Sequence, residues 1–133
     1  MADEGFRSGM QSSTTIWTGE ARGGVVVSLF QGEILFGNGV RGICAGVETI
    51  DSTDGDAFRG SLIVTLPDGS ISRQGFEGQT TLRDTPERLR GSGTWRFESG
   101  SGTFADLTGG GVFDWRLDGA AYHATFRAAP RGD

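Results

Sequence analysis

The strongest constraint on the fold is an alternation of aromatic and polar residues along the last third of the chain. Glycine-rich segments divide it into three runs, whose apolar positions are Trp95 and Phe97, then Phe113, Trp115 and Leu117, then Tyr122, Ala124 and Phe126. A period of two places every second side chain on one face of an extended strand, and aromatic residues favour strands. The three runs therefore predict three half-buried β-strands.

The connection between the first two of these strands, over residues 99–111, is rich in glycine but carries two apolar residues, Phe104 and Leu107. Apolar side chains in a loop of small and polar residues gain free energy when they are buried. We therefore predict that this loop closes one mouth of the structure, with both side chains pointing inward against Trp95 and Trp115.

Upstream, the same alternation predicts five further strands joined by short turns. We expect them at 12–21, 25–30, 34–49 with a glycine interruption at 37–39, 57–66 and 71–82. Asp118-Gly119 supplies the residue types of a two-residue hairpin turn, whose central positions need a positive φ. Residues 83–90, RDTPERLR, predict a helical turn, because Pro86 suits the first helical position.

These elements predict one all-β domain within the 133 residues. We expect a flexible N-terminal arm over 1–12, the β-domain over 13–128 and a short tail over 129–133. Eight strands with short turns and no βαβ unit are typical of an antiparallel up-and-down β-barrel or a sandwich, and we favour the barrel.

Glycines within the expected strands bear on what such a barrel encloses. The glycines concerned are Gly42, Gly46, Gly60, Gly75 and Gly78. They either add little volume to the interior and so leave space there, or they only permit strong coiling of the strands. An eight-stranded barrel has an interior that side chains either fill or line around one small ligand. The first interpretation favours a ligand-sized space.

One segment resembles a known family. The run ESGSGTFADLTGGG, residues 98–111, is similar to the G-T-G-x-[FY]-x-x-[LA]-x-G-x-G connection of the allene-oxide-cyclase-like barrels. That group includes plant allene oxide cyclases, dirigent proteins, bacterial spirotetronate cyclases and small bacterial proteins of unknown role. The resemblance implies a calycin-like eight-stranded barrel whose lumen binds an apolar polyene or acyl chain and steers its cyclisation by shape, without a cofactor. The motif is structural, so it assigns no catalytic residue.

Composition excludes several classes of partner. A net charge of −5 and a pI near 4.8 disfavour nucleic acid and anionic membranes, which attract basic patches. Cys44 is the single cysteine, so no intramolecular disulfide framework exists, and the N-terminus does not resemble a signal peptide. We therefore expect a cytoplasmic protein.

Metal and cofactor chemistry lack the usual signals. His123 is the only histidine, no Cys/His cluster has metal-ligand spacing, and no P-loop or dinucleotide fingerprint is present. We expect neither a metal nor a cofactor. His123 has the opposite parity to Tyr122 and Phe126, so only one of these sets faces the interior.

We expect the substrate-binding residues among the aromatic and ionisable residues of the strands. They are Trp17, Trp95, Trp115, Tyr122, Phe126, Glu48 and His123. An inward ionisable group is costly unless it is paired or used. The predicted function is a cofactor-independent cyclase or isomerase of a hydrophobic polyketide or fatty-acid-derived intermediate. The alternative is a non-catalytic protein that binds a small hydrophobic ligand.

The segment Val25-Val26-Val27 bears on assembly, because it is apolar on both faces of its strand. We expect a second subunit to cover its outward side, as in related barrels, and we expect a homodimer.

Overall fold

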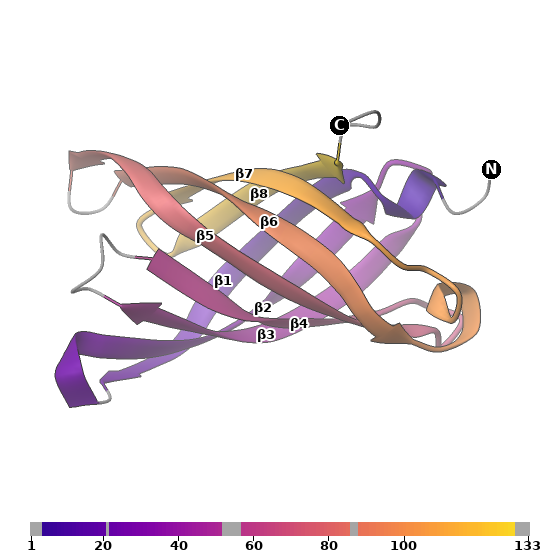
Figure 1. The fold of residues 1–133 in the computed structure, drawn as a ribbon, viewed down its shortest axis with the longest axis horizontal. Coiled ribbons are helices and arrows are strands. Elements are labelled where there is room, and N and C mark those ends of the chain that lie inside the picture. Colours follow the sequence, from indigo (N-terminus) through magenta and orange to yellow (C-terminus); the bar gives the residue numbers. More distant parts are fainter. Residues whose placement is uncertain (1–3, 21, 52–56, 86–87, 130–133) are drawn as a thin grey trace.

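The computed structural model describes residues 4–20, 22–51, 57–85 and 88–129, and these residues form a closed antiparallel barrel (Figure 1). Its strands are β1 Gly9–Glu20, β2 Val25–Phe36, β3 Arg41–Asp51, β4 Ala57–Thr65, β5 Ile71–Thr85, β6 Arg88–Gly100, β7 Gly110–Asp118 and β8 Ala121–Ala128. Three short 3-10 turns are η1 Glu4–Phe6, η2 Arg22–Gly24 and η3 Gly102–Phe104. Each strand pairs with the next, and β8 pairs with β1. The predicted eight-stranded up-and-down barrel is confirmed, and a sandwich is excluded.

The alternation in the sequence becomes the inside and the outside of the barrel. Along β7, Phe113 and Trp115 are buried, whereas Asp114 and Arg116 between and after them are exposed. Successive side chains of a strand point to opposite faces, so the apolar set fills the interior and the charged set meets solvent.

Among the described residues, six aromatic rings lie over a glycine that is directly across from them on the neighbouring strand. The pairs are Phe30–Gly46, Phe58–Gly78, Phe76–Gly60, Phe113–Gly93, Trp115–Gly91 and Phe126–Gly9. In each pair a Cβ on the glycine would approach a ring atom more closely than 3.0 Å. The rings therefore lie over the glycines along the wall, and a side chain at Gly46, Gly60 or Gly78 would clash with the ring across from it. Gly75 differs from these three, because a Cβ there would meet the side chains of Arg96 and Glu98.

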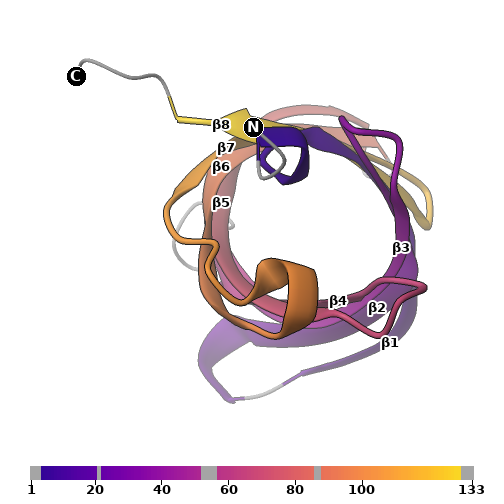
Figure 2. The same cartoon turned by 90° about the vertical axis from the view of Figure 1, so that its right-hand side faces the viewer.

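η1 and η3 lie on opposite sides of one mouth of the barrel in Figure 2, and the contact between the rings of Phe6 and Phe104 closes this end. Phe104 of η3 is 1% exposed, and its ring centroid lies 5.3 Å from that of Phe6 and 6.1 Å from that of Phe36. The Arg7 guanidinium donates a hydrogen bond of 2.6 Å to the Thr108 carbonyl. The prediction that Phe104 points inward is confirmed, but its aromatic neighbours are Phe6, Phe36 and Phe97 rather than Trp95 and Trp115.

The expected flexible arm over 1–12 was wrong for residues 4–12. Phe6 is buried against the closed end, and β1 begins at Gly9 and pairs with both β2 and β8. The segment folds back because an apolar ring stabilises the end of the core and because both neighbouring strands offer backbone partners. Of the expected tail over 129–133, residues 130–133 lie outside the described residues.

Three local predictions also need correction. The expected helical turn over 83–90 was wrong, since β5 runs to Thr85 and β6 begins at Arg88; residues 86–87 lie outside the described residues. No turn occurs at 31–33, because β2 continues through Gly32. The last hairpin loop is Gly119-Ala120 rather than Asp118-Gly119, since Asp118 pairs with Ala121; Gly119 has the positive φ of 64°.

Candidate functional site

The lumen contains a cavity of about 370 Å³, a size typical of small-molecule sites. On one side it adjoins the core cluster of the closed end, and Ile34 and Leu62 belong to both. On the other side its lining reaches Ile50, Leu89 and Leu117, each one residue from the end of its strand, at the barrel end opposite η1 and η3 (Figure 1). The cavity therefore occupies the half of the barrel that the phenylalanine-rich core leaves unfilled.

The cavity has two chemically different walls. The polar wall comes mainly from β1, β2 and β3 and contains Gln11, Ser13, Thr15, Thr18, Ser28 and Glu48. The aromatic wall comes from β4 to β8 and contains Phe58, Phe76, Trp95, Phe113, Trp115 and Tyr122. An amphipathic small molecule would find apolar contact on one side and hydrogen-bonding groups on the other.

The aromatic wall is a connected set of rings. Phe58 meets Trp115 edge to face at a centroid distance of 5.6 Å, and Trp115 stacks on Tyr122 at 6.0 Å with an interplanar angle of 24°. Edge-to-face and stacked pairs favour fixed ring orientations. The Trp95 indole N–H is anchored to the Arg127 carbonyl at 3.2 Å, whereas the buried Trp115 N–H has no partner among the described residues. An acceptor on a ligand would satisfy this second donor.

Glu48 places a carboxyl group in this cavity. Its Cα partners on β2 and β4 are Ser28 and Gly60, neither of which is charged. Burial raises the pKa of Glu48 from 4.5 to about 7. Burial also raises the pKa of the Tyr122 phenol, and the charge of Glu48 adds to that shift. Glu48 can thus exchange a proton near neutral pH, which is the range in which a general acid or base works well.

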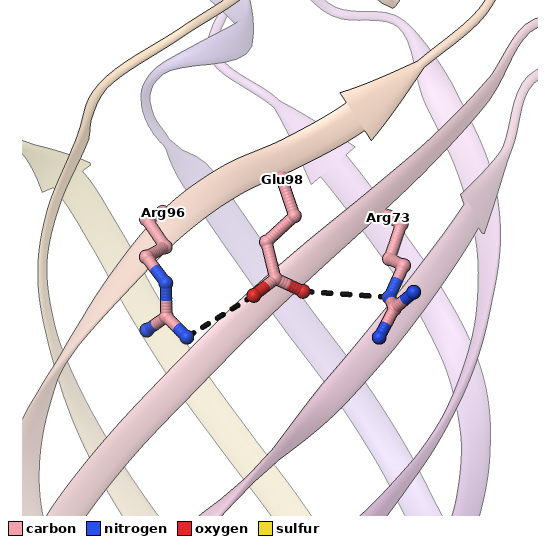
Figure 3. A network of polar contacts seen from close by, with 3 residues as sticks. All are labelled: Arg73, Arg96 and Glu98. Carbon is pink, nitrogen blue, oxygen red and sulfur yellow. Dashed lines mark hydrogen bonds and ion pairs between the residues drawn. The ribbon is translucent and has the colours of Figure 1, made fainter.

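Arg73 of β5 and Arg96 and Glu98 of β6 lie outside the cavity lining. On the outer face, the Arg73 Nε lies 3.4 Å from Glu98 Oε1, and Arg96 Nη2 lies 3.1 Å from Glu98 Oε2 (Figure 3). Both arginine side chains are more than half exposed, so these ion pairs add little stability. Their position leaves the lumen without these cations.

Five of the seven predicted site residues line the cavity. They are Glu48, Trp95, Trp115, Tyr122 and Phe126. The parity argument is also resolved, because the Tyr122 and Phe126 set faces inward. His123 was therefore wrongly placed: it is exposed on the outer face, where it forms a hydrogen bond of 3.2 Å with the Ser12 hydroxyl.

Trp17 was also wrongly placed in the lumen. The pairing of β1 with β2 shifts between Thr15 and Trp17, so Ile16 is an extra residue in a β-bulge. Thr15 and Thr18 line the cavity, while Ile16 and Trp17 are 55% and 54% exposed. A bulge reverses which face each later residue of the strand points to. Strict alternation from Thr15 ignores the bulge and therefore predicted that Trp17 points inward.

Sequence reasoning missed much of the polar wall and part of the aromatic wall. Gln11 was assigned to the arm, although its spacing from Ser13 and Thr15 is the signal of a shared strand face. Phe58 and Phe76 carried the same signal as the later aromatics, because each alternates with polar residues or glycine.

The remaining reactive side chain, Cys44, belongs to the packed core. Burial raises the pKa of its thiol to about 11, which keeps it protonated and unreactive. Within the described ranges, no three His, Cys, Asp or Glu side chains gather as a metal-binding group.

Comparison with known proteins adds no relative: no family model, no curated protein and no solved structure matches the chain. Over the described part of the chain, none of the helical segments has the length and apolar character needed to cross a membrane.

Proposed function

We propose that the protein binds a small hydrophobic molecule in the barrel lumen and acts on it as a cofactor-independent cyclase or isomerase. The observation that carries this proposal is the cavity of about 370 Å³ with an aromatic wall, a polar wall and one half-buried carboxyl group, that of Glu48. The resemblance of residues 98–111 to the allene-oxide-cyclase-like barrels supports the same reaction class.

The aromatic wall would act by shape. Its rings hold one another through edge contacts such as Phe58–Trp115, so a flexible chain bound against them loses conformations that do not lead to ring closure. Glu48 would act by proton transfer, giving a proton to the substrate and recovering one from the product, which leaves the mass of the substrate unchanged.

Binding and turnover are tested separately. Trp95 and Trp115 line the cavity and report binding by fluorescence, and a Trp17→Phe background removes the exposed outer tryptophan. Incubation with polyketide and fatty-acid-derived intermediates, followed by a search for products of unchanged mass, tests turnover. Glu48→Gln should keep binding and lose turnover, whereas Glu77→Gln on the exposed outer face of β5 should keep both.

Failure of every intermediate to quench the two lumen tryptophans would contradict a lumen ligand. Quenching without any product would favour the non-catalytic ligand-binding protein over the enzyme. A Glu48→Gln variant that turns over at the wild-type rate would remove Glu48 from the reaction and leave shape as the source of catalysis.

We also propose that the protein is a homodimer in the cytoplasm. The supporting observation is an outer apolar face formed by Trp17, Leu29, Ile43, Val47, Ile63 and Ile71, each of them 38% exposed or more. Val25 and Val27 lie half-buried on the same strand as Leu29, whereas Val26 lines the cavity. Exposed apolar patches of several hundred Å² mark interaction sites, and a second copy offers a matching apolar surface under two-fold symmetry. The single free Cys44 suits a reducing compartment.

A further inference from the structure

The charge of the cavity restricts what it can hold. Among the described residues of its lining, Glu48 is the one acidic side chain, and arginine, lysine and histidine are absent from that lining. The arginines near the barrel wall, Arg73 and Arg96, lie on the outer face instead (Figure 3). A bound anion would therefore meet a carboxylate without a cation to offset it.

Glu48 also lacks an internal partner. Within the described part of the chain, no side chain donates a hydrogen bond to its carboxylate and no cation pairs with it, and the neighbouring strands place Ser28 and Gly60 opposite it. The titratable group that faces it from across the barrel is the Tyr122 phenol. A carboxylate that is half-buried in a mostly apolar cavity and has no partner is costly, so a ligand with a positive charge would gain the ion pair that the fold does not provide.

The aromatic wall favours the same charge. Trp115 contacts both Tyr122 and Phe58 along the cavity, and the faces of such rings attract cations, most strongly when water is excluded. The carboxylate on the polar wall and the rings on the aromatic wall thus act on the same space from two sides.

We propose that the lumen selects a hydrophobic molecule that carries one positively charged nitrogen, with Glu48 as its counter-ion and the rings around Trp115 as its apolar and cation-binding surroundings. This inference rests on the proposed lumen site and names its ligand class. It disfavours a free fatty acid, whose carboxylate would face that of Glu48.

Three probes of eight carbons each compare the charge of the head group: octylamine, octanol and octanoate. Their dissociation constants are measured by tryptophan fluorescence in the Trp17→Phe background at pH 8, where Glu48 is ionised. We expect octylamine to bind about tenfold more tightly than octanol, the size of effect that one charge-assisted hydrogen bond supplies, and octanoate to bind most weakly. Glu48→Gln should bring octylamine and octanol to similar affinity, while Glu77→Gln should leave the preference intact.

A second measurement does not depend on the variants. In the Trp17→Phe protein, lowering the pH from 8 to 5 protonates Glu48, so the preference for octylamine should disappear while octanol binds as before. Equal binding of the three probes, tighter binding of octanoate, or an amine preference that persists in Glu48→Gln would overturn the inference and leave lumen binding in place. Absence of binding by all three would overturn the lumen site itself.

Discussion

Phe58 on β4 lies directly across from Gly78 on β5, and its ring occupies the space that a side chain at position 78 would need. The same relationship recurs around the barrel, as in Phe113 with Gly93 and Phe76 with Gly60. A ring that lies over a glycine covers the backbone and stays close to the wall. Aromatic side chains can therefore line this lumen without filling it.

Gly78→Ala should destabilise the fold by about 1–3 kcal/mol, because the new Cβ would lie 2.7 Å from Phe58 Cζ and close to the Ser92 backbone oxygen. Gly75→Ala on the same strand is the matched control. The three atoms nearest its Cβ would be at the ends of the Arg96 and Glu98 side chains, at 2.8 Å, and these can move into solvent. We expect a change within about 0.5 kcal/mol there. Urea unfolding measures both, and equal losses would contradict the role of the ring.

Phe104→Ala should cost about 3–5 kcal/mol of unfolding free energy, because it removes a ring that is 1% exposed and packed against Phe6 and Phe36. Leu107→Ala in the same loop should cost less, since Leu107 is only half-buried. Denaturant midpoints provide the comparison. A Phe104→Ala protein with the wild-type midpoint would show that η3 does not seal the closed end.

The stability of the protein should fall as the pH rises through neutrality. The folded-state pKa of Glu48, about 7, lies above its ordinary value of 4.5, so the folded protein binds this proton more tightly than the unfolded chain. Its contribution is complete below pH 4.5 and is lost as the pH passes 7, which amounts to roughly 2–3 kcal/mol between pH 5 and pH 8.

Glu48→Gln should abolish that part of the pH dependence. The measurement does not go below pH 5, because Asp68 makes an opposite contribution to stability that is lost in acid. Hydrogen bonds from Ser70 are the main cause of the lowered pKa of Asp68. Urea unfolding at pH 5 and pH 8 compares the wild type with the variant. An equal slope in both proteins would place Glu48 in contact with water rather than in an apolar cavity.

Leu29→Glu should convert the proposed homodimer to a monomer. Leu29 pairs with Trp17 on β1 and Val47 on β3, so a charge there would lie in the middle of the outer apolar face. Arg116→Glu, at an exposed position of β7 outside this apolar face, should leave assembly unchanged. Sedimentation at micromolar concentration distinguishes the species. A wild-type protein that sediments as a monomer would end the proposal.

Local pattern alone predicted the eight strands and named Trp95, Trp115, Tyr122 and Phe126 as candidate site residues, but it left open whether Tyr122 and Phe126 or His123 face the interior. This succeeded because alternation is a property of neighbouring residues, and a strand with one apolar face must bury that face. Glu48 was identified for the related reason that a charge in an apolar strand is costly unless it is used.

Tertiary structure decided what depends on residues far apart in the chain. The bulge at Ile16 follows from the pairing of β1 with β2, and it turned Trp17 outward against its parity. The packing of Phe6 on Phe104 joins segments that nothing local connects. The unfilled cavity depends on six rings that each meet a glycine one strand away, in a register that barrel closure sets and that no window of sequence contains.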